Sequence, residues 1–120
     1  ACRAGTTTPF HFGETITGAV ANYQAKSRSA QKPKDNFQAA PSVVGLFQIA
    51  NGYGLSDMHG NVNEWCATAR PDRRNNRAIR GGSWNAPAAG CRSAFRNHQP
   101  PNQASSGIGF RIACNPWVRA

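Results

Sequence analysis

NGYGLSDMHGNVNEW (residues 51–65) and AIRGGSW (residues 78–84), joined by a basic segment, are the stretches that decide the fold. Together they contain five glycines and no sustained apolar period of either a helix or a strand. Segments of this composition are held by turns. We therefore predict a turn-rich centre, from which the C-terminal part of the chain displays a surface.

The length and the cysteines limit the class of protein. At 120 residues and 12.9 kDa the chain fits one domain with a modest core. No apolar run reaches the roughly 18 to 20 residues that span a bilayer, and no signal-peptide pattern opens the sequence, so we expect no membrane role. The four cysteines lack zinc or disulfide-framework spacing, which predicts buried thiols in a reducing compartment, the cytoplasm of a prokaryotic cell. They are Cys2, Cys66, Cys91 and Cys114.

The net charge of +9 and the pI near 10.5 raise nucleic acid or an acidic surface as a partner. Most arginines are dispersed, and the single cluster is interrupted by Pro71 and Asp72. A solvated basic loop is favoured over a phosphate-binding patch, and both readings stay open. The cluster consists of Arg70, Arg73, Arg74 and Arg77.

Short extended segments and loops are expected along the chain, with little helix. Phe10 and Phe12 alternate with His11, which predicts both phenyl rings on one face and His11 as a solvent-facing spacer. Residues 18–41 form a long polar loop. The apolar run 42–50 predicts a short buried strand or extended segment, and residues 78–84, 91–96 and 107–114 each predict a short strand. These elements indicate an α+β or mainly irregular domain.

Two carboxylates flank the glycine-bearing turn. Asp57 and Glu64, with the carbonyls between them, can converge on a hard cation that prefers oxygen ligands. The alternative is that Asp57 caps the turn and Glu64 pairs with an arginine. No nucleophile elbow, phosphate-binding loop or dinucleotide fingerprint is present.

NGYGLSDMHGNVNEWC, AIRGGSW, CRSAFR and GIGFRIA, in this order, resemble the formylglycine-generating-enzyme (sulfatase-modifying factor) family. ACRAGTTTPFHFG resembles the segment that follows an RLPTEAEWE-like helix in that family. The resemblance implies a C-type-lectin-like fold and covers nearly the whole chain. Residues 1–120 are then the larger, C-terminal part of one domain, and an upstream domain or chain is expected to supply an N-terminal part.

The family's structural calcium sites can be transferred residue by residue. The resemblance implies one site from the Asp57 and Glu64 side chains with the Gly60 and Val62 carbonyls. Asn63 stands where the family usually has Trp, which changes local packing and removes no carboxylate. A second site is implied in the long polar loop. Its ligands are Asn22, the Tyr23 carbonyl, Asp35 and the Phe37 carbonyl.

The family's oxidising members use two cysteines shortly after G-G-S to bind copper and to oxidise a substrate cysteine. Here Ala86 occupies the position of the first cysteine, which leaves Cys91 alone. One thiol cannot make a two-thiolate copper site. We therefore expect no copper and interpret the chain as a non-catalytic relative.

Residues 84–110 resemble the variable region of proteins diversified by retroelements, in which a lectin-like scaffold holds mutable side chains. Gln99 and Gln103 do not fit a simple Asn-codon origin, and an ordinary unvaried relative remains an equal alternative. The main hypothesis is a recognition module whose C-terminal loops bind an unknown protein or small ligand. The alternatives are a formylglycine-type oxidase and a basic nucleic-acid-binding domain. The candidate ligand-binding residues are Trp84, Asn85, Ala86, Ala88, Phe95, Asn97, His98, Asn102, Ser105 and Ser106.

Overall fold

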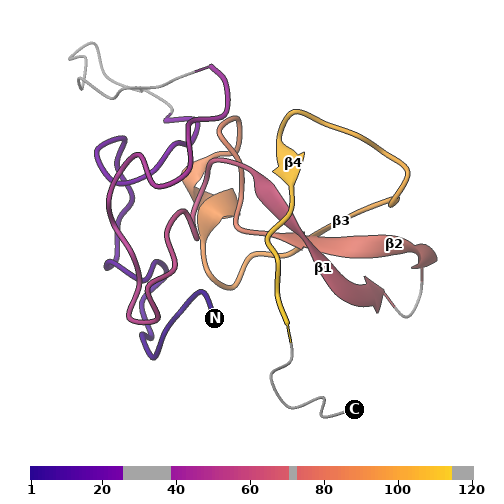
Figure 1. The fold of residues 1–120 in the computed structure, drawn as a ribbon, viewed down its shortest axis with the longest axis horizontal. Helices are drawn as coiled ribbons and strands as arrows, with labels where there is room; N and C mark the ends of the chain where they lie inside the picture. Colours follow the sequence, from indigo (N-terminus) through magenta and orange to yellow (C-terminus); the bar gives the residue numbers. More distant parts are fainter. Residues whose placement is uncertain (26–38, 71–72, 115–120) are drawn as a thin grey trace.

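A computed structural model of the chain describes residues 1–25, 39–70 and 73–114. A four-stranded sheet runs through the described part in the order β3-β2-β1-β4 (Figure 1). The strands are β1 (Asn63–Arg70), β2 (Arg73–Arg80), β3 (Asn97–Gln99) and β4 (Ile108–Gly109). β1 pairs antiparallel with β2 and parallel with β4, and β2 pairs antiparallel with β3.

The register separates the two faces of the sheet. Ile79 pairs with both Trp65 and Asn97, so these three residues share one face. Glu64 pairs with Arg80 and therefore lies on the other face, because alternate residues of a strand point to opposite sides. Each face carries a cavity, as described below.

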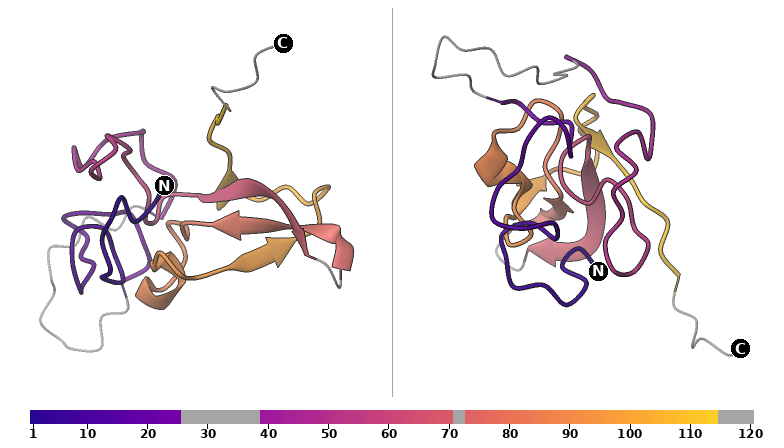
Figure 2. Two further views of the ribbon diagram at one scale, coloured as in Figure 1. Left: turned by 90° about the horizontal axis from the view of Figure 1, so that it is seen from below. Right: turned by 90° about the vertical axis from the view of Figure 1, so that its left-hand side faces the viewer.

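Outside the sheet the described chain is irregular, with one 3₁₀ helix, η1 (Ala88–Cys91), and no α-helix among the described residues. Figures 1 and 2 show the loops of residues 1–25 gathered at one end of the sheet, with the β1–β2 hairpin extending away from them. The core cluster lies between these loops and η1. It consists of Phe10, Ile16, Ala21, Tyr23 and Cys91.

The predicted strand over residues 42–50 is wrong. The chain turns at Val43–Leu46, and the Val43 and Val44 side chains are 73% and 83% exposed. Gly45 takes a φ of 74° and donates its N–H to the Asp57 carboxylate at 2.6 Å, and this bond stabilises the turn. An apolar composition had suggested burial, but the backbone reverses before a strand can form.

The other predicted strands are present in shortened or shifted form. The strand expected at 78–84 ends at Arg80, because Gly81 and Gly82 both take positive φ values (98° and 76°). The strand expected at 91–96 lies at Asn97–Gln99, after η1, and the one expected at 107–114 is confined to Ile108–Gly109.

No helix in the described part of the chain is long and apolar enough to cross a membrane.

Two expectations near the N-terminus had different outcomes. The Phe10 and Phe12 rings do share a face, and they stack with centroids 5.6 Å apart. His11 is not a solvent-facing spacer: its ring stacks on His59, with ring centroids 5.0 Å apart, and both of its ring nitrogens are buried.

The four cysteines are free, but only Cys91 is buried, and Cys114 is exposed.

Candidate ligand-binding site

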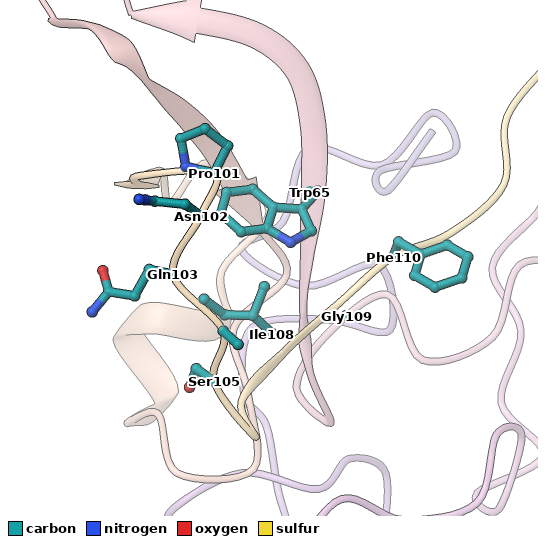
Figure 3. A pocket seen from close by; sticks show the side chains of 9 residues that line it. Trp65, Pro101, Asn102, Gln103, Ser105, Ile108, Gly109 and Phe110 are labelled. Atoms are coloured by element: carbon teal, nitrogen blue, oxygen red, sulfur yellow. The ribbon is translucent and has the colours of Figure 1, made fainter.

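A cavity of about 300 Å³ lies beside β1 and β4, on the sheet face that carries Trp65. Figure 3 shows the Trp65 indole next to Ile108, with the loop of residues 101–105 passing over them. Aromatic and apolar groups thus form the floor of the cavity, and polar side chains form its rim. The lining residues are Trp65, Pro101, Asn102, Gln103, Ala104, Ser105, Ile108, Gly109 and Phe110.

Hydrogen bonds hold the loop over the cavity. The Gln103 N–H donates to the Pro100 carbonyl (3.0 Å), and the Ile108 N–H donates to the Ser105 carbonyl (3.1 Å). At the end of the loop, the Asn63 N–H of β1 donates to the Gly107 carbonyl at 2.8 Å. Each bond closes a turn or joins the loop to the sheet, so the rim is largely preformed.

The loop after β2 meets the same region. The Trp84 indole N–H donates to the Ser106 carbonyl at 3.3 Å. The Asn85 amide oxygen accepts a hydrogen bond from the Ser83 hydroxyl (2.7 Å) and lies against Gly107. Two loops separated by some twenty residues of sequence therefore converge beside the cavity.

Five of the ten candidate ligand-binding residues lie at or beside the cavity. Asn102 and Ser105 line the cavity, with Trp84, Asn85 and Ser106 beside it.

Asn97 and His98 lie on the edge strand β3, where Asn97 shares a face with Trp65. The half-buried Phe95 lies next to Arg80, whose guanidinium donates to the Phe95 carbonyl. Ala86 and Ala88 pack against the core cluster, so the structure does not bring them to the cavity.

Sequence reasoning missed the floor of the cavity. Trp65, Ile108 and Phe110 line the cavity but were not among the candidate ligand-binding residues. Phe110 is 78% exposed and therefore accessible to a ligand. The signal was the alternation along β1: when Glu64 points to one face, Trp65 points to the other. Which strand stands beside β1 could not be read from that alternation.

The first implied calcium site is occupied by protein contacts. The Arg111 guanidinium binds the Glu64 carboxylate with two nitrogens, Nε at 2.9 Å and Nη2 at 2.7 Å from Oε1. Nη2 also donates to the Ser56 carbonyl at 2.8 Å. The Glu64 hydrogen bonds raise the pKa of Arg111, so the guanidinium stays charged. The arginine alternative named for Glu64 is thus present, whereas the Asp57 carboxylate accepts from Gly45 in the Val43–Leu46 turn and not from the turn that Asp57 and Glu64 flank.

The donor set still suits a hard cation. Asp57 and Glu64 are both carboxylates, and Gly60 has a φ of 82° that sets the turn between them. Arg111 would have to share Glu64 with the cation or leave it.

In the second implied site, one ligand oxygen has no hydrogen-bond partner among the described residues. Asn22 is 3% exposed, and its Nδ2 donates to the Ala40 carbonyl at 2.9 Å. Its Oδ1 is buried with no hydrogen-bond partner among the described residues, as expected of an atom that faces a cation. Tyr23 is buried beside it, and Asp35 and Phe37 lie outside the described residues.

The remaining family cysteine is inaccessible. Cys91 is fully buried, and burial raises the pKa of its thiol to about 11. Gly82 packs so closely that a Cβ there would collide with the Cys91 sulfur. Cys91 therefore acts as a small apolar core residue.

The basic cluster lies on the β1–β2 hairpin. Arg70 pairs with Arg73 at its end, and Arg77 pairs with Gln99 of β3. The exposed Arg77 donates to the Ala67 carbonyl at 3.0 Å. For Arg70, Arg73 and Arg74 the structure describes the backbone but not the side chains.

The whole arrangement matches a known domain. The model of the sulfatase-modifying factor enzyme 1-like domain matches residues 1–116. The chain belongs to this family. The resemblance found in the sequence motifs is confirmed, and with it the C-type-lectin-like fold with short strands and much irregular structure.

Relatives of this sulfatase-modifying factor enzyme 1-like domain are longer. The mouse protein named inactive C-alpha-formylglycine-generating enzyme 2 is 38% identical over 97 residues, covering 76% of the chain and 31% of the relative. Treponema denticola variable protein 1 superposes with a TM-score of 0.71 at 26% identity, covering 91% of this chain and 41% of the other. PvdO from Pseudomonas aeruginosa gives a TM-score of 0.71 at 29% identity, with coverage of 91% and 46%. The chain thus spans less than half the length of each.

Proposed function

We propose that this domain is a non-catalytic recognition module that binds its ligand at the cavity beside Trp65. The observation that carries the proposal is the combination of an aromatic and apolar floor with a polar loop rim held by hydrogen bonds. Such a site has the aromatic anchors that dominate binding energy and polar groups that set specificity.

The state of the cysteines supports a role without catalysis. Ala86 replaces the first family cysteine, and Cys91 is a buried, protonated thiol. One of the relatives carries the word inactive in its name. A peptide-oxidation activity that depends on copper and disappears in Cys91→Ser would contradict this part of the proposal.

We further propose that a retroelement diversifies the rim residues of the cavity. A structural relative is named a variable protein, and the rim residues Asn102 and Ser105 lie in a loop between short strands, where substitutions leave the sheet intact. The coding sequence tests this part. A near-copy of the 3′ end that differs at adenines, next to a reverse transcriptase gene, is the expected result.

Calcium is proposed as a structural ion of the same domain. Asn22 with Asp35, and Asp57 with Glu64, would supply hard oxygen ligands together with the carbonyls of Tyr23, Phe37, Gly60 and Val62. Asn22 Oδ1, which has no hydrogen-bond partner among the described residues, supports the second site, in the long polar loop. When bound, calcium would hold the polar loop and the central turn in place, and it would take no part in ligand chemistry.

Ser105→Tyr tests the binding site, because it fills the cavity from an exposed position without disturbing the core. The matched control is Thr15→Tyr, at a hydroxyl residue that is exposed in the N-terminal loops and lies outside the cavity lining. We expect the wild type and Thr15→Tyr to bind the same members of a peptide and glycan array. Ser105→Tyr should lose about tenfold or more in affinity, the effect of blocking one anchor.

The proposal is contradicted if the wild type and Ser105→Tyr bind the same array members, and also if neither protein binds any member. Binding of nucleic acid that weakens steeply with salt and ignores Ser105→Tyr would favour the basic hairpin instead.

A further inference from the structure

A second and larger cavity, of about 620 Å³, lies on the opposite face of the sheet. Glu64, Cys66 and Arg80 project into it from β1 and β2. Leu55 and Met58 add apolar wall. Trp65 borders both cavities, but the other lining residues of the second cavity, and its charge, differ from those of the first.

Positive charge dominates this cavity. Among the described residues, four arginines place guanidinium groups along it, and Glu64 is the one that brings a carboxylate. Glu64 is already bound by Arg111 in the ion pair at 2.7 Å. The other three arginines, Arg3, Arg80 and Arg92, have no carboxylate partner within the described part of the chain.

The three unpaired arginines are held in place by neutral groups. Arg80 Nη1 donates to the Phe95 carbonyl at 2.7 Å, and Arg3 Nη1 donates to the Thr8 carbonyl at 2.8 Å. Arg92 Nε donates to the Ala89 carbonyl at 3.0 Å. Each group is oriented, yet its charge is not neutralised, and unused N–H donors remain for an oxyanion.

The chain beside the cavity also offers an open backbone edge. β4 is an edge strand, and residues 112 and 113 continue past it without a hydrogen bond to the described residues. Ala113 lines the cavity, and Ile112 is 86% exposed. An added extended segment can pair with such an edge and place alternate side chains over the cavity.

We propose that this cavity binds a polypeptide segment that pairs along the edge after β4 and inserts a carboxylate side chain between Arg80 and Arg92. Charge complementarity selects the acidic residue, and the apolar wall selects a hydrophobic neighbour. A free small acid would use the arginines but leave the strand edge unpaired, so a peptide fits both features.

The test uses the fluorescein-labelled peptide Leu-Glu-Phe-Glu-Leu and its Leu-Gln-Phe-Gln-Leu counterpart. The acidic peptide should bind the wild type, and the Gln peptide should bind at least tenfold more weakly. Arg92→Gln should weaken the acidic peptide about tenfold, the loss expected for one charged hydrogen bond. The matched control Arg96→Gln changes the same charge at an exposed residue that does not line the cavity, and should leave affinity within twofold.

Cysteine alkylation locates the bound peptide. Cys66 lines the cavity and is half-buried. The peptide should slow alkylation of Cys66 by iodoacetamide in the wild type and in Arg96→Gln, and much less in Arg92→Gln. Equal losses of affinity in Arg92→Gln and Arg96→Gln, or equal protection of Cys66 in these two variants, overturn the proposal. Glutarate that protects Cys66 as well as the peptide does would make this a small-acid site and overturn the peptide assignment.

Discussion

The Nδ1 atom of His59 lies 2.7 Å from the backbone carbonyl oxygen of Cys91. The opposite ring nitrogen, Nε2, accepts a hydrogen bond from the His11 N–H at 3.0 Å. His59 must therefore carry its proton on Nδ1 and be neutral to satisfy both partners. One buried side chain thus joins the N-terminal loop, the central turn and η1, three parts of the chain far apart in sequence.

Replacing His59 by Leu should destabilise the domain by about 2 to 4 kcal/mol, because a buried carbonyl and a backbone N–H both lose their partner. Urea unfolding followed by tryptophan fluorescence measures the change. His98→Leu, a half-buried position on β3 without a side-chain hydrogen bond in the described structure, is the control and should change stability by less than about 1 kcal/mol. Equal effects of the two substitutions would show that His59 has no special role.

His11→Phe should have the opposite sign. Both ring nitrogens of His11 are buried without a partner among the described residues, so an apolar ring of similar shape removes an unsatisfied group. We expect a gain of about 1 kcal/mol at pH 7. A loss of stability there would show that the nitrogens have a partner after all.

The gain should grow at acid pH. Burial lowers the pKa of His11 below its ordinary value of 6.5, so the unfolded chain takes up the proton first as pH falls. Wild-type stability is therefore fully present above pH 6.5 and declines below it, and His11→Phe removes this contribution to the decline. Unfolding free energies at pH 5 and pH 7 measure the difference, which should be larger at pH 5.

The turn centre of the fold could be predicted because its determinants are local. Asn51 illustrates this: its side-chain oxygen accepts from the N–H groups of Tyr53 and Leu55, within the NGYGL motif itself. Of β2 (Arg73–Arg80), only residues 78–80 were predicted: the expected strand ran on through Gly81 and Gly82 to Trp84, and a basic loop was expected where β2 begins.

The parts that could not be predicted depend on distant partners. Val43 and Val44 look like core residues, but Gly45 bonds to Asp57 and turns them outward. Trp65 became a cavity floor only because β4 and its loop pack next to β1, and Glu64 lost its free carboxylate to Arg111, 47 residues away. No pattern within a short window carries such information.

Gly60→Ala should be among the most damaging small substitutions in the chain. Gly60 has a φ of 82°, and a Cβ there would collide with the Asn22 carbonyl oxygen. We expect a loss of more than about 3 kcal/mol, or failure to fold. Gly54→Ala separates strain from collision: its φ is 74°, but a Cβ meets nothing within 4 Å, so it should lose only about 1 kcal/mol. Similar melting temperatures for the two variants would contradict the close contact with Asn22.

Cys91 should resist alkylation at pH 8. Its thiol is fully buried with a pKa raised to about 11, so both access and thiolate formation are suppressed. Iodoacetamide should modify it at least about 100-fold more slowly than the exposed Cys114, as read by mass spectrometry of peptides. Addition of urea should equalise the two rates. Comparable rates in the native protein would indicate an accessible thiolate and would reopen the case for metal or redox chemistry.

Arg111→Gln decides whether calcium competes with the guanidinium at Glu64. The substitution removes the bidentate pair and leaves a half-buried carboxylate unpaired, so in EGTA the variant should be less stable than wild type by about 2 to 3 kcal/mol. Millimolar calcium should raise the melting temperature of Arg111→Gln more than that of wild type, because the competing cation is gone. Arg111→Gln/Glu64→Gln is the control, and calcium should not restore it through this site. If calcium leaves the melting temperatures of both wild type and Arg111→Gln unchanged, the Asp57–Glu64 turn is held by Arg111 alone.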